Sequence, residues 1–266
     1  MAKSAFKKGR RACCFCGGFD LSKEHIWPEW AAKLLPEGDN THARSKYEGW
    51  GQEERLVDRW HRQGPPKTIR IYGVCKTCNN GWMGEMEEEV RPWLGPILKR
   101  EPVGLTEAGQ RILANYLVMK AMVADQSRPG ENVFSKGERT AFYNDRAIPE
   151  ATFVTLYRYN HEPDPFVTQY NKETHGVFIE QLVDGEVERK GVANQTFRFG
   201  ELFAQVVLLR DAEGKLETKP GFPLRIHPSI HHTLHWPPLF RLPPSGAYMI
   251  QHLLQRSVES GTIVVG

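Results

Sequence analysis

The sequence lacks any apolar run near the ~18–20 residues that a membrane-spanning helix requires. Its N-terminus is charged and has no apolar stretch behind it, so the pattern of a secretory signal peptide is missing. It also contains no internal repeat and no low-complexity tract. From these absences we expect a globular protein that is cytoplasmic and has no membrane partner.

A large excess of one charge is missing as well, since the formal net charge of the 266 residues is only +3. The hydrophobic share of 40% is ordinary for a globular chain, and the length allows one large or two modest domains. Positive charge is nevertheless concentrated in an N-terminal arm just before the first cysteines. Two interpretations of this arm stay open, a solvated terminus or a segment that contacts phosphates. In the second, the nucleic-acid-binding residues are Lys7, Lys8, Arg10 and Arg11.

The sequence has few cysteines, and their number is odd. Five cysteines argue against a disulfide framework and favour metal ligation in a reducing compartment. Four of them form two C-x-x-C pairs, Cys13 with Cys16 and Cys75 with Cys78, which leaves Cys14 over. A pairing of Cys14 with Cys16 stays open, although C-x-x-C is the commoner spacing. Because four thiolates close a tetrahedral Zn²⁺ site, we expect a structural zinc ion with no open catalytic position.

The residues around the second cysteine pair have the pattern of a strand followed by a helix. Residues 68–74 alternate and are β-branched, which predicts a strand that leads into Cys75. Apolar residues then recur at helical spacing over residues 79–91, which predicts a helix that breaks or kinks at Pro92. The polar segment between the pairs is expected to contain at most a brief helix, over residues 53–61. Strand, cysteine pair and helix follow in the order of a treble clef.

Beyond a boundary near residue 101 the pattern changes to long helices and alternating strands. We therefore expect an α+β chain with two domains, a zinc-containing one over residues 1–101 and a helix-plus-antiparallel-sheet one over residues 102–266. Thr106 has the position of a cap for a long apolar helix to about residue 125, in which Lys120 is expected to snorkel to the surface. Further elements are predicted as a helix capped by Ser135, strands over 152–159, 166–170, 177–183 and 196–209, a turn at Asp184-Gly185, and a helix over 247–256.

Three polar residues near the cysteines are candidates for chemistry. Glu24 and His25 lie between the two pairs, and Asn79 directly follows Cys78. Hydrolysis of a phosphodiester needs a base to activate water and a cation to stabilise the departing oxygen. A hard cation such as Mg²⁺ prefers oxygen ligands, which the carboxylate and the amide provide, and the imidazole can be the base.

In this joint pattern, over roughly residues 10–95, the chain resembles the HNH (ββα-metal, His-Me finger) endonucleases that carry a four-cysteine zinc site, in the layout of the endonuclease VII branch. The resemblance implies a zinc-stapled nuclease domain in which His25 is the general base. It further implies that Glu24 and Asn79 hold a catalytic Mg²⁺ or Mn²⁺ ion. The expected substrate is nucleic acid, with DNA favoured, and such modules serve in phage biology, restriction and antiviral defence.

Several alternatives remain. Asn80 is the alternative to Asn79 as an ion ligand, because on an ideal helix it shares a face with Glu87. Glu87 itself is expected to be a solvated carboxylate. Residues 36–66 are an expected insertion relative to minimal HNH modules. Residues 102–266 are expected to select substrate, form a homodimer or bind a protein partner. The alternative function is a non-catalytic zinc module that binds nucleic acid or protein, in which Glu24 and His25 have no chemical role.

Overall fold

The computed structural model describes twelve stretches of the chain, which are residues 11–34, 41–48, 55–63, 70–127, 132–160, 168–175, 180–183, 186–189, 191–210, 217–218, 223–251 and 264–265. They form a mixed α+β structure, which confirms the predicted class. The helices are α1 (Glu29–Ala32), α2 (Lys76–Asn80), α3 (Trp82–Leu98), α4 (Glu107–Asp125), α5 (Lys136–Asp145) and α6 (Pro244–Gln251). None of the described helices combines the length and the apolar character that crossing a membrane requires.

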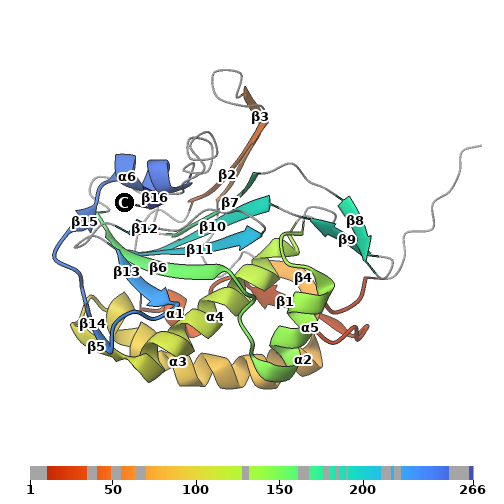
Figure 1. Cartoon of the computed structure of the whole chain (residues 1–266), viewed down its shortest axis with the longest axis horizontal. Coiled ribbons are helices and arrows are strands. Elements are labelled where there is room, and N and C mark those ends of the chain that lie inside the picture. Colours follow the sequence, from red (N-terminus) through yellow and green to blue (C-terminus); the bar gives the residue numbers. More distant parts are fainter. Residues whose placement is uncertain are drawn as a thin grey trace, which may run out of the picture.

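The main sheet has six strands and carries helices on both faces (Figure 1). Its path is β13 (Leu224–His227), β6 (Thr152–Tyr159), β11 (Leu202–Arg210), β10 (Gly191–Phe199) and β7 (Thr168–His175), and these neighbours are antiparallel. A short strand, β15 (Arg241–Leu242), pairs parallel with β6. Because strand side chains alternate between faces, Val206 and Leu208 join the cluster that includes α4, whereas Val207 and Leu209 join the one that includes α6.

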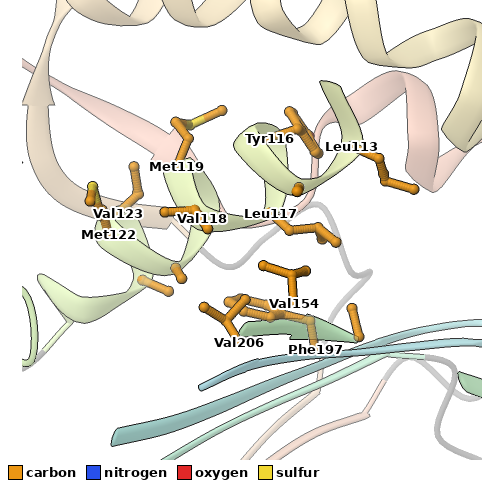
Figure 2. Close-up of a cluster of buried hydrophobic side chains, with 14 of the residues drawn as sticks. Leu113, Tyr116, Leu117, Val118, Met119, Met122, Val123, Val154, Phe197 and Val206 are labelled. Atoms are coloured by element: carbon orange, nitrogen blue, oxygen red, sulfur yellow. The ribbon is translucent and has the colours of Figure 1, made fainter. Parts of the chain in front are cut away.

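Helix α4 is the central element of the larger hydrophobic cluster. Figure 2 shows its buried side chains above Val154, Phe197 and Val206 of the main sheet. Its other side packs on α3, and the two helices approach closely at Gly109, where an added Cβ atom would lie 2.7 Å from the Trp93 ring. This cluster runs from Cys13 to Trp236, so the predicted boundary at residue 101 does not separate two hydrophobic cores.

The remaining described strands form two-stranded ribbons. The ribbon that matters for the candidate site is β1 (Leu21–His25) with β4 (Arg70–Cys75), which packs against α2 and α4 (Figure 1). The others are β2 (Thr41–Glu48) with β3 (Arg55–Gln63), β5 (Val103–Thr106) with β14 (Thr233–Trp236), β8 (Glu180–Val183) with β9 (Glu186–Arg189), and β12 (Glu217–Thr218) with β16 (Val264–Val265). The β2–β3 ribbon falls within the expected insertion.

Local capping signals predicted two helices correctly. The Thr106 hydroxyl accepts a hydrogen bond from the Gly109 amide at the start of α4, and Ser135 and Glu138 form the capping box of α5. Strand β6 occupies the predicted range, and β8 and β9 pair on either side of the predicted turn, whose two residues lie outside the described ones. Strands β4 and β7 and helix α6 overlap their predicted ranges with shifted ends.

Three expectations about elements were wrong. Residues 55–63 form strand β3 and not a helix, because they pair along β2. The range 196–209 is two strands, β10 and β11, joined at Gly200, whose φ of +61° allows the tight reversal. Helix α3 also continues to Leu98 and does not break at Pro92, since its apolar face stays buried on both sides of the proline. The alternative of a kink at Pro92 stays a prediction.

Candidate metal centre and active site

Four cysteine sulfurs come together at one end of the β1–β4 ribbon. The Sγ atoms of Cys13, Cys16, Cys75 and Cys78 all lie within 4.8 Å of one another, which is an arrangement that could hold a metal ion such as zinc. A tetrahedral ion with Zn–S bonds of about 2.3 Å places its sulfurs about 3.8 Å apart. The separations of Cys13 from Cys78 and of Cys16 from Cys75 are 3.9 and 3.5 Å. The amides of Gly18 and Cys78 each donate to a cysteine sulfur at 3.4 Å, Gly18 to Cys16 and Cys78 to Cys75.

Cys14 is outside this cluster and has a different role. Its thiol is buried, and burial raises its pKa, so it stays protonated. Its amide donates to the Gly73 carbonyl at 2.8 Å, and its carbonyl accepts from Arg139 Nε at 3.0 Å. The first pair is therefore Cys13 with Cys16, as the spacing predicts.

The cluster joins two segments that are distant in sequence. Gly17, with a φ of +74°, directly follows Cys16 and closes the turn that begins at Cys13. Its amide donates to the Cys13 carbonyl, and the Cys13 amide donates to the Gly18 carbonyl. Strand β4 ends at Cys75, whose sulfur caps α2 by accepting from Cys78. The register then pairs Leu21 with Cys75 and His25 with Arg70, so the cysteine cluster and the Glu24-His25 pair occupy opposite ends of the same ribbon.

His25 points to the outer side of the ribbon, next to its cross-strand partner. Arg70 Nε donates to His25 Nε2 at 2.8 Å, and Glu29 Oε1 lies 3.9 Å from the same nitrogen. Burial and the positive charge of Arg70 lower the pKa of His25, and this outweighs the opposing charges of Glu24 and Glu29. At neutral pH the imidazole is therefore neutral, and it presents Nε2 as an acceptor.

Glu24 points the other way, into the protein, where it is only 5% exposed. Its Oε1 atom accepts from Lys120 Nζ at 2.7 Å. The same ammonium donates to Glu87 Oε1 at 3.0 Å and to the main-chain carbonyl of His25 at 3.2 Å, and it lies 5.6 Å from the centre of the Tyr116 ring. We call Lys120, Glu24, Glu87 and the His25 carbonyl the Lys120 cluster.

The Lys120 cluster corrects two expectations. Lys120 is 1% exposed and so does not snorkel, because β1 and α3 cover the part of α4 on which it lies. Burial disfavours its ammonium form, but Tyr116 and the carboxylates of Glu24 and Glu87 outweigh this and raise its pKa above the ordinary value. Glu87 is not a simply solvated carboxylate either, since it shares this ammonium with Glu24.

Asn79, the predicted ion ligand on α2, lies beside β1. Its Nδ2 atom donates to Ser22 Oγ at 3.3 Å, which leaves the amide oxygen, the atom that binds ions, for other contacts. A register shift of the ribbon falls between Ser22 and Lys23, so regular alternation along β1 does not place Ser22 and Glu24 on one side of the strand. The Asn79 amide and the Glu24 carboxylate have different partners, Ser22 and Lys120. Asn80 is exposed.

The predicted basic arm falls largely outside the described residues, which include only Arg11, an exposed residue, from that set. The structure adds a basic and aromatic face that spacing alone did not define. Lys23 pairs with Tyr72 in the same ribbon register in which His25 pairs with Arg70, and Tyr72 is 47% exposed. The β1–β4 ribbon therefore carries positive charge and an aromatic ring on the side of His25.

Comparison of the chain with protein-family models, with curated proteins and with solved structures found no match. The chemistry of the site follows from its own geometry. That geometry consists of a four-cysteine cluster, a neutral imidazole beside a guanidinium, and a buried lysine between one buried and one half-buried carboxylate.

Proposed function

We propose that this protein is a metal-dependent endonuclease that hydrolyses phosphodiester bonds of DNA. The observation that carries the proposal is the divergence of two adjacent side chains at the end of β1. His25 faces outward as a neutral acceptor against Arg70, and Glu24 faces inward beside a second carboxylate. Phosphodiester hydrolysis requires a base that activates water and a cation at the leaving oxygen, and these two side chains would supply the base and an oxygen ligand for the cation.

In the proposed mechanism, His25 Nε2 accepts a proton from the water that attacks the phosphorus. Arg70, which touches that nitrogen, moves to a phosphate oxygen and stabilises its charge. Glu24, with the oxygen of Asn79, or of Asn80 in the alternative, would hold Mg²⁺ or Mn²⁺, with Glu87 as a further candidate. When bound, that ion supplies positive charge at the leaving 3′-oxygen. The products carry 5′-phosphate and 3′-hydroxyl ends.

The assignment to an HNH-like, treble-clef layout is part of this proposal. It is supported by the order of the parts around the four-cysteine cluster, which are a cysteine turn, strand β1 ending in Glu24-His25, its partner strand β4 and helix α2. Helix α1 and the β2–β3 ribbon lie between β1 and β4 in the sequence. The proposed zinc ion has no open position and acts as a scaffold for the ribbon.

The experiment that tests the function is nicking of supercoiled plasmid DNA with Mg²⁺ or Mn²⁺. We expect the wild-type protein to nick the plasmid and His25→Ala to lose about 10²–10⁴-fold in rate, as removal of a general base does. Zinc content should be unchanged, because His25 is not in the cysteine cluster. His235→Ala, which removes an exposed histidine of β14, is the matched control and should retain activity. Equal nicking by His25→Ala and wild type would refute the assignment.

Arg70 gives a prediction about pH. Its charge lowers the pKa of His25, so the rate of the wild type should fall only as the pH drops below the ordinary histidine value of 6.5. Arg70→Gln removes that charge, so the pKa of His25 rises and the acid limb of kcat/KM should move to higher pH. Arg111→Gln, at an exposed position of α4, is the control and should leave the limb in place. If the acid side of the pH profile of kcat/KM is unchanged in Arg70→Gln, or moves to lower pH, His25 is not the base.

The second candidate function is a non-catalytic zinc module that binds nucleic acid or protein. One observation favours it, namely that the Glu24 carboxylate is already bound to an ammonium and the Asn79 amide to Ser22. In that case wild type and His25→Ala should bind DNA equally and neither should cut it, whatever divalent ion is added.

A further inference from the structure

The Lys120 cluster uses every donor of its ammonium. A lysine ammonium has three N–H groups, and Lys120 has three oxygen partners within 3.2 Å. Two of these partners lie on β1 and one on α3, whereas Lys120 itself comes from α4. The cluster therefore fixes three elements at one point, and one of its contacts is to the main chain of His25, the proposed base.

The charges of the cluster do not cancel. One ammonium faces two carboxylates, so at neutral pH the formal sum is −1. The side chains of Lys120 and Glu24 are 1% and 6% exposed, but that of Glu87 is 23% exposed, so the residual negative charge is reachable from solvent at Glu87. A divalent ion is attracted to this site, yet it meets an ammonium that already holds one oxygen of Glu24.

We propose that Lys120 is a positioning residue of the candidate active site, which fixes the main chain of His25 and competes with the divalent ion for Glu24. This inference rests on the proposed function. It also gives residues 102–266 a direct part in the site, because the residue that holds Glu24 and His25 lies 96 and 95 positions further along the chain. The N-terminal region does not complete the site without α4.

The decisive variant is Lys120→Met combined with Glu87→Gln. Methionine has a similar length without charge, and the second change keeps the formal sum of the cluster at −1. The rate of plasmid nicking per zinc-loaded, folded protein is measured against Mg²⁺ concentration. With the competing ammonium gone, we expect the half-saturating Mg²⁺ concentration to fall about tenfold. With the His25 carbonyl released, we expect the saturating rate to fall about tenfold or more.

Two further variants separate the effects. Glu87→Gln alone keeps the ammonium on Glu24, so its half-saturating Mg²⁺ concentration should not fall. Lys120→Arg keeps the charge but has a planar group that does not reproduce three separate contacts. It should therefore retain a wild-type Mg²⁺ requirement with a lower saturating rate, and it tests the positioning role even where the double variant does not fold.

A lower Mg²⁺ requirement together with a lower saturating rate in the double variant supports the proposal. An unchanged Mg²⁺ requirement overturns it, because that is the result expected for a lysine with a structural role alone. If the wild type cuts no DNA with any divalent ion, the proposed function fails separately. Competition for Glu24 is then tested by direct titration of the zinc-loaded proteins with Mn²⁺. Tighter binding by the double variant supports competition, and equal affinity overturns it.

Discussion

Cys16→Ala is expected to release the zinc ion and to lower the thermal midpoint of unfolding by roughly 10 °C or more. Cys16 is the informative choice because it is the exposed member of the four-cysteine cluster, so its replacement removes a ligand but little packing. Without the ion, nothing covalent joins the turn at Cys13 to the start of α2. The β1–β4 ribbon, which carries Glu24 and His25, would then lose its anchor.

Cys14→Ala is the matched control, in which packing is lost but the zinc content is expected to stay unchanged. Cys14 is buried but outside the cluster, so its replacement removes packing and keeps all four ligands. We expect one zinc per chain in wild type and Cys14→Ala, and a loss of zinc in Cys16→Ala, as measured by elemental analysis and thermal unfolding. Equal zinc content in the two variants would show that the four sulfurs do not form the metal site.

Lys120→Met as a single change is expected to destabilise the fold by about 3–5 kcal/mol, because it leaves two carboxylates facing one another without a cation. The measurement is chemical denaturation at neutral pH. Restoring neutrality with Glu24→Gln and Glu87→Gln in the same chain should recover a large part of the loss, since the uncompensated negative charge and not a loss of side-chain packing is the cause.

The single variant should also respond to pH in a defined direction. Burial and mutual repulsion would raise the pKa of these carboxyls in the folded variant above their unfolded values. A carboxyl whose pKa is higher in the folded than in the unfolded state stabilises the fold at pH values below its pKa in the unfolded state. That stabilisation is lost as the pH rises through its pKa in the folded state. The deficit relative to wild type should therefore shrink as pH is lowered from 7 toward 5. If the loss in free energy of unfolding is small at pH 7, or becomes larger as the pH is lowered, Lys120 does not compensate the charge of the two carboxylates in the folded protein.

The sequence predicted the parts of the structure that short-range chemistry determines. Cysteine spacing identified the four sulfurs that come together in a cluster able to hold a metal ion. The hydroxyls of Thr106 and Ser135 marked the starts of α4 and α5, because a cap acts within one helical turn. The partner of Glu24 could not be found in this way. It is 96 residues distant, and a lysine within an apolar helix has the same pattern whether it snorkels or enters an ion cluster.

The same limit explains the errors in the sheet. The apolar residues of β10 and β11 run together as one strand, and only Gly200 marks the reversal between them. Arg70 falls under the same limit, because it lies 45 residues from His25 along the chain. Its contact with His25 became evident only from the register of β1 with β4.

The most direct test of the proposed site is a crystal soaked in Mn²⁺ and examined by anomalous scattering. A nuclease of the proposed kind should show one zinc peak among the four cysteine sulfurs and a manganese peak at a carboxylate oxygen of Glu24. The second ligand would decide between Asn79, Asn80 and Glu87. A zinc peak alone, with Lys120 still bound to Glu24 and no manganese beside it, would contradict the catalytic site and leave a zinc-containing binding protein.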